Sequence, residues 1–181
     1  MKKELSLFIA SVMMLLVFTP VMENAQAADN EDLGNSEQQE AVQLEKELRE
    51  NDITELDIVT GLDEQLSSTP AYNEQTTVQA QGVKSKTAAY GAKQMITMLE
   101  NTGKYAWNSS VKEYVDKLPI STASKSTLEK YLGYQFVMET LNVVINFQGD
   151  ITEALSLQMQ NAGLPSWLSG IAARTLVFLL L

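Results

Sequence analysis

The chain has 181 residues, a formal net charge of −10, and neither cysteine nor histidine. Without these two residue types it has no disulfides, no histidine metal site and no catalytic dyad or triad that uses either side chain. An acidic balance also argues against nucleic-acid binding, which needs a basic surface. We therefore expect a non-enzymatic protein without a cofactor or metal, whose fold depends on apolar packing.

The first 27 residues have the layout of an export signal. A short basic start precedes the apolar run Leu5–Phe18, and this run is shorter than the roughly 20 residues that a membrane-spanning helix needs. Ala25 and Ala27 are the small residues that a signal peptidase recognises, so we expect cleavage before Ala28. An uncleaved membrane anchor is the alternative. We expect a secreted or extracytoplasmic protein, and the absence of cysteine favours a bacterial source.

Residues 28–83 form an acidic segment, in which 14 Asp and Glu residues stand against two basic residues, for a net charge of −12. Asp29–Gln39 is polar throughout, and we expect it to be disordered. Ser67–Lys86 is polar, with a proline and a glycine and no apolar period, and we expect a linker. The segment as a whole is therefore expected to be largely disordered.

Two weak helices are expected within the acidic segment. Their apolar residues recur at helical spacing: Val42, Leu44 and Leu48 in the first, and Ile53, Leu56, Val59, Leu62 and Leu66 in the second. Leu56–Thr60 fits a short strand equally well. Neither helix is long enough to be stable alone in water, so both need a surface to lie on.

Residues 84–181, the body, carry a net charge of +2 and are much more apolar. Capping residues, glycines and prolines bracket successive stretches whose apolar residues have helical spacing. This pattern predicts an all-α domain, a compact bundle of about five helices. Their expected ranges are 87–101, 110–118, 126–147, 151–161 and 165–181.

The helix expected at 126–147 is apolar on two sides, so it should lie between other helices. A polar stripe of Gln135, Glu139, Asn142 and Asn146 separates the two sides. If protein covered this stripe, Glu139 would need a partner and its pKa would rise. We favour the other interpretation, in which the stripe is the side open to water. It is still a candidate surface for a partner.

The helix expected at 165–181 becomes apolar on all sides toward its end, so it should be buried in protein or in lipid. Arg174 lies in its middle, which argues against a complete membrane crossing. A core helix is the favoured interpretation. Contact with a membrane surface or a partner through Trp167, Ile171, Arg174 and Phe178 is the alternative.

Three functions stay open. The first is a secreted, non-enzymatic, membrane-active protein with the layout of a bacteriocin or toxin precursor, whose acidic segment is a pro-region. The second is an extracytoplasmic binding or structural module of the bacterial cell envelope. The third, a hydrolase that uses carboxylates alone, is disfavoured because the sequence places no second carboxylate beside Glu139. The expected partner is a membrane lipid or a cell-envelope protein.

Overall fold

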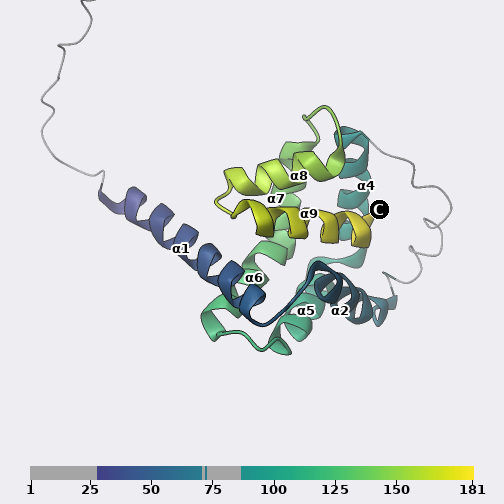
Figure 1. Cartoon of the computed structure of the whole chain (residues 1–181). Helices are drawn as coiled ribbons and strands as arrows, with labels where there is room; N and C mark the ends of the chain where they lie inside the picture. The colour runs from purple at the N-terminus through teal and green to yellow at the C-terminus, as the bar shows by residue number, and fades with distance from the viewer. Residues whose placement is uncertain (1–27, 71, 73–86) are drawn as a thin grey trace, which may run out of the picture.

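The structure is a computed structural model that describes residues 28–70, 72 and 87–181. Within these residues the chain forms eight helices and no strand, which confirms the predicted all-α fold (Figure 1). The only β-type pairing described is an isolated bridge between Thr87 and Asp150. The expected signal peptide, with Ala25 and Ala27, lies outside the described residues, and Ala28 is the first residue of α1.

The acidic segment is more ordered than its composition indicates. It contains α1 (Ala28–Glu50) and α2 (Glu55–Ser67), so the disorder expected for Asp29–Gln39 is corrected. Thr54 begins α2 with a capping box, in which its hydroxyl accepts from the Asp57 N–H and the Asp57 carboxylate accepts from the Thr54 N–H. The strand alternative for Leu56–Thr60 is wrong, because these residues lie inside α2.

Both helices of the segment bury one apolar face. The buried residues belong to the same core cluster as the body: Ala41, Leu44, Leu48, Ile53, Ile58, Leu62 and Leu66. Val42 and Leu56, expected on these faces, are instead exposed at 59% and 68%. The core of the body thus supplies the surface that two helices of this kind require.

The body has six helices rather than about five. They are α4 (Ala88–Thr102), α5 (Lys104–Asp116), α6 (Thr122–Leu132), α7 (Tyr134–Val144), α8 (Ile151–Asn161) and α9 (Ser166–Leu180). The expected ranges 87–101, 151–161 and 165–181 agree with α4, α8 and α9 to within one residue. The helix expected at 110–118 begins earlier, at Lys104, because Gly103 ends α4 with a φ of 82° and α5 starts at the next residue.

The helix expected at 126–147 is two helices, α6 and α7, with a break at Gly133. The backbone is extended there, and a Cβ on Gly133 would lie 2.7 Å from the Glu129 carbonyl oxygen. The neighbouring helix α5 satisfies the groups that the break leaves free. Trp107 Nε1 donates to the Leu132 carbonyl at 2.8 Å, and Asn108 Oδ1 accepts from the Tyr134 N–H at 2.8 Å.

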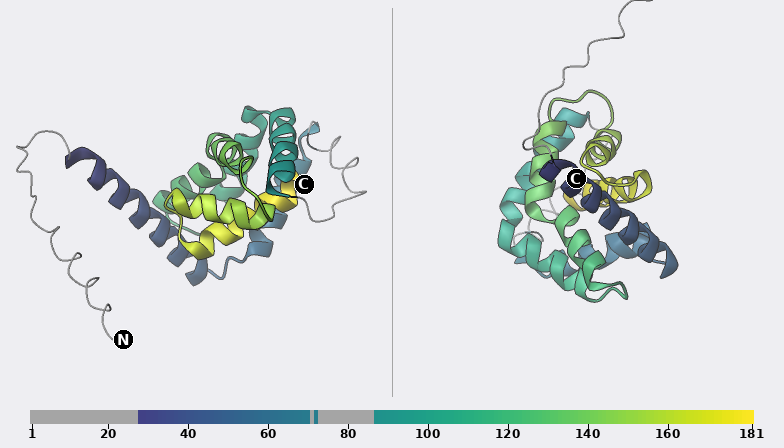
Figure 2. Two further views of the ribbon diagram at one scale, coloured as in Figure 1. Left: turned by 90° about the horizontal axis from the view of Figure 1, so that it is seen from above. Right: turned by 90° about the vertical axis from the view of Figure 1, so that its left-hand side faces the viewer.

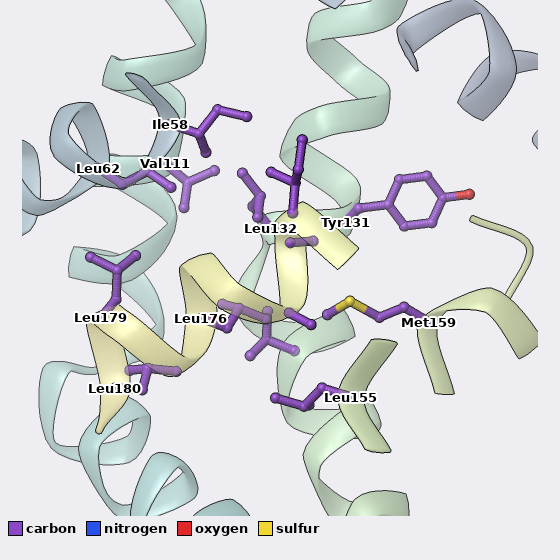
Figure 3. Packing of buried hydrophobic residues seen from close by; sticks show 14 of the residues in the cluster. Ile58, Leu62, Val111, Tyr131, Leu132, Leu155, Met159, Leu176, Leu179 and Leu180 are labelled. Carbon is purple, nitrogen blue, oxygen red and sulfur yellow. The ribbon is translucent and has the colours of Figure 1, made fainter. Parts of the chain in front are cut away.

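The helix α9 lies at the centre of the packing and contacts α8, α4 and α2. Nine of its residues are buried, among them Ala173, Leu176 and Leu180. Figure 3 shows this cluster, with side chains of α9 among those of α2, α5 and α8: Leu176, Leu179, Leu180, Ile58, Leu62, Val111, Leu155 and Met159. The acidic segment and the body therefore share one core.

Candidate functional site

The polar stripe is open to solvent. Gln135, Glu139, Asn142 and Asn146 are all exposed, the first three on α7 and Asn146 just beyond its end. The Gln135 amide donates to Glu139 Oε1 at 2.7 Å. Glu139 is therefore neither covered by protein nor hydrogen-bonded to a second carboxylate.

A cleft of about 550 Å³ lies beside the N-terminal end of the stripe, between α5, α6 and α7. Val111 and Phe136 contribute apolar surface, and several charged side chains line the rest. Lys112 Nζ lies 2.9 Å from an Asp116 carboxylate oxygen and 3.8 Å from one of Glu129. Because the lysine and the carboxylates neutralise each other, this cleft suits a polar partner better than a strongly charged one.

The four candidate contact residues of α9 have the spacing i, i+4, i+7 and i+11, which places them on one face of the helix. Trp167 is partly buried, and the Arg49 guanidinium of α1 lies 4.3 Å from the centre of its ring. Ile171 is buried. Arg174 pairs with Glu55, and Phe178 is exposed at 64%. The acidic segment therefore contacts this face at Trp167 and Arg174, and Phe178 remains exposed.

The helix α1 packs along α6 through two acidic residues. Lys130 Nζ lies 2.8 Å from Glu37 Oε1. The Glu47 carboxylate accepts from the Ser121 N–H at 2.7 Å and from the Ser121 hydroxyl at 2.9 Å, at the N-terminus of α6. Hydrogen bonds from Gln43 and then from the Ser121 N–H lower the pKa of Glu47 to about 2.

The helix α2 packs on α5 and α9. Gly61 faces α5, where an added Cβ would lie 2.2 Å from Cε2 of the Tyr114 ring. Only glycine therefore fits between α2 and this buried aromatic side chain. On the α9 side, Arg174 Nε and Nη2 each lie 2.7 Å from Glu55 Oε2.

Tyr72, which follows α2, lies inside the predicted linker Ser67–Lys86. It is buried, whereas Ser67 still belongs to α2 and residues 71 and 73–86 lie outside the described part. Its hydroxyl is 3.0 Å from the Leu179 carbonyl oxygen of α9 and 3.2 Å from Asp63 Oδ1, so one proton is shared between two acceptors. Burial, and next the charge of Asp63, raises the pKa of Tyr72. The acidic segment is thus anchored on three helices of the body: α6, α5 and α9.

The sequence indicated the face of α9 but not the contacts of the acidic segment with the body. No local signal marks these contacts, because each joins residues far apart along the chain. The residues of the segment that make them are Glu37, Glu47, Glu55 and Tyr72. Glu55 and Arg174, for example, are 119 positions apart. Only the packed structure brings these groups together.

Among residues 28–70, 72 and 87–181, no helix is long and apolar enough to cross a membrane. The same residues contain no group of acidic side chains that could hold a metal ion. Comparison with protein-family models, with curated proteins and with solved structures finds no match. The fold and the site define an all-α protein in which an acidic helical segment covers part of a near-neutral body.

Proposed function

We propose that the protein is secreted by a bacterium, is not an enzyme and acts on membranes, and that residues 28–83 are a pro-region of the body, residues 84–181. The observation that carries this proposal is the position of the acidic segment. It lies against the face of α9 that holds Trp167 and Arg174. An aromatic residue and a cation on one face of an apolar helix are typical of a helix that lies in a membrane surface.

The charges of the two parts support the same proposal. The acidic segment carries a net charge of −12 and the body +2, so the intact chain is repelled by anionic lipids. Loss of the segment would reverse the sign of the protein. It would also remove the carboxylates of Glu37 and Glu55 from Lys130 and Arg174.

The packing of the body supports the proposal that it stays folded without the segment. In the body, α8 packs on α9 and on α7, α4 packs on α7, and α5 packs on α6. The segment contributes apolar residues of α1 and α2 to the core that it shares with the body. After a cut in the polar stretch 73–83, α1 and α2 would be held by noncovalent contacts alone.

The test is a chain from Ala28 to Leu181 with a specific protease site inserted between residues 73 and 83. Dye release from vesicles that contain anionic lipid is measured before and after the cut. We expect low release from the uncut chain and a marked increase after the cut, and a decrease when the separated segment is added back. The uncut chain treated with inactivated protease is the control. If the cut and uncut chains are equally inert, the proposal is wrong.

A second candidate, an extracytoplasmic binding or structural module of the bacterial cell envelope, is favoured by the α5–α6–α7 cleft and the exposed polar stripe beside it. Affinity capture with the intact chain would recover a defined envelope protein, and replacement of Gln135 and Glu139 by alanine would weaken the capture. Mass spectrometry of the secreted protein separates the two candidates. A second cut near Val83 supports the pro-region, whereas a chain that begins at Ala28 supports the module.

A further inference from the structure

Two basic side chains of the body form ion pairs with carboxylates of the acidic segment. Lys130 on α6 pairs with Glu37, and Arg174 on α9 pairs with Glu55. Burial lowers the pKa of Lys130, but the hydrogen bond and charge of Glu37, followed by the charges of Tyr131 and Glu40, raise it above its usual value. Both side chains keep about half of their surface in water, at 45% and 51% exposure.

Other lysines of the body are different. Lys112 pairs with Asp116 on its own helix and with Glu129 on α6, both within the body. The Lys125 ammonium donates to the Asp116 carbonyl oxygen. Departure of the acidic segment therefore leaves Lys112 and Lys125 as they are, and removes the partner carboxylates of Lys130 and Arg174.

The contacts of the segment resemble those of an anionic headgroup. A carboxylate and a phosphate both present acidic oxygens to lysine and arginine, and guanidinium in particular binds either one through adjacent N–H groups. Arg174 already uses two nitrogens, Nε and Nη2, on one oxygen of Glu55. The side chains of Glu37 and Glu55 thus occupy the positions that two phosphate oxygens would take.

We infer that Lys130 and Arg174 bind the anionic headgroups of a phospholipid bilayer, and that Glu37 and Glu55 occupy these positions while the acidic segment is in place. This inference rests on the proposed membrane activity and names its lipid and its contact residues. A bilayer, rather than a soluble anion, is indicated by the aromatic residues on the same face of α9. Trp167 is covered by Arg49 of the segment, and Phe178 is exposed at 64%. Tryptophan at the level of the headgroups is typical of membrane-surface helices.

The arrangement of the segment agrees with this assignment. In the right-hand view of Figure 2, α1 crosses in front of the body, and Figure 1 shows its N-terminal end extending beyond the body. The helix continues through a short turn into α2, which packs on α9. One continuous stretch of chain, Glu37–Glu55, therefore covers both proposed headgroup positions.

The experiment uses the intact chain from Ala28 to Leu181, because two carboxylates can be neutralised without removing the segment. The variant Glu37→Gln with Glu55→Gln frees both cations of the body. Its matched control is Glu64→Gln with Glu100→Gln, which changes the net charge equally. Both side chains are exposed, and the structure describes no ion pair for either. Binding is measured by sedimentation with vesicles of phosphatidylglycerol and phosphatidylcholine, and with vesicles of phosphatidylcholine alone.

We expect the Glu37/Glu55 variant to bind the anionic vesicles more tightly than the control pair, by on the order of 30-fold. This corresponds to about fivefold for each basic side chain that becomes available near an anionic surface. Adding Lys130→Gln and Arg174→Gln should abolish the gain, whereas adding Lys112→Gln should leave most of it. Phosphatidylcholine vesicles should show no gain. Circular dichroism verifies that each variant keeps its helices.

Three results would overturn the inference: an equal gain in the control pair, a gain that survives the loss of Lys130 and Arg174, or an equal gain on neutral vesicles. Absence of binding by every variant would overturn it as well. The outcome is separate from that of the proposed function. Dye release after the cut, together with no difference between the two glutamine pairs, would keep the membrane activity and reject these two residues as its headgroup contacts.

Discussion

In the body, the helices pack on one another, whereas in the acidic segment α1 packs on α6 and α2 packs on α5 and α9. Within the described residues, α1 and α2 make no comparable contact with each other. The segment therefore has no core of its own. Its order depends on the body, whose helices also pack on one another.

The two regions also differ in the chemistry of their contacts. The core of the body is largely apolar, and its buried polar residues are uncharged serines and threonines. The segment adds charged contacts to its apolar ones, through Glu37, Glu47 and Glu55. Charged contacts at a surface are weakened by salt and by protonation. Solution conditions should therefore change the docking of the segment before they change the body.

The largest expected effect is that of Trp107→Ala in the body. The side chain is 1% exposed, and it caps the end of α6 through its bond to the Leu132 carbonyl. Its removal should lower the free energy of unfolding by about 3–5 kcal/mol. Denaturant unfolding followed by circular dichroism measures this, and the segment should be lost in the same transition. A segment that stays protected from protease while the body unfolds would contradict the dependence described above.

The next largest effect is expected from Gly61→Ala. This substitution should weaken the docking of α2 while the body stays folded. Its Cβ would collide with the Tyr114 ring, so α2 should move away from α5 at a cost of about 1–3 kcal/mol. Limited proteolysis should then cut the segment faster while the body stays folded. The control is Glu64→Ala, an exposed position on the same helix. Equal protection of the two variants would show that the close approach does not hold α2.

Local signals in the sequence predicted much of the body. The ends of α4, α8 and α9 lie within one residue of the predicted ones, and the Asp150 carboxylate caps α8. The spacing of Trp167 and Arg174 also placed both on one face of α9. These features depend on a few neighbouring residues, so local sequence patterns predict them.

Features that depend on distant residues were not predicted. The break at Gly133 lies in a stretch that is apolar on both sides. It is stabilised by the hydrogen bonds Trp107–Leu132 and Asn108–Tyr134, which join residues 25 and 26 positions apart. The order of α1 likewise depends on α6, because a polar sequence of this kind is helical only where a partner supplies contacts. The candidate face of α9 was therefore predicted from the sequence, whereas the contacts of the acidic segment with this face were not.

A smaller effect is expected from Tyr72→Phe. The hydroxyl contacts the Leu179 carbonyl oxygen of α9 and the Asp63 carboxylate, while the ring is buried and would stay in place. The loss of this hydrogen bonding should cost about 0.5–1.5 kcal/mol. Amide hydrogen exchange should show faster exchange in α2 and little change in α8. Tyr72→Ala should have a larger effect, because it also removes the ring. If the phenylalanine variant matches the alanine variant, the hydroxyl rather than the ring anchors the chain.

The smallest expected effect is the pH dependence of the α1–α6 contact. The pKa of Glu47 is about 2 in the folded chain, below its usual 4.5, so the folded state favours the charged carboxylate. The stabilisation is therefore complete above about pH 4.5 and is lost as the pH falls toward 2. Carboxyl titration by nuclear magnetic resonance should find this low pKa, and protease protection of α1 should fall across the same range.

Two variants isolate the contribution of Glu47. Glu47→Gln removes the charge that the Ser121 N–H and hydroxyl bind, so α1 should be less protected at neutral pH and its protection should change less with acid. Glu45→Gln removes a carboxylate that pairs with Arg49 inside α1, so it should keep the acid response. Apolar contacts through Ala41, Leu44 and Leu48 persist in both variants, which is why the effect stays small. An acid response that is identical in the two variants would assign the pH dependence to the other carboxylates of the segment, and Glu47 would then be an ordinary surface contact.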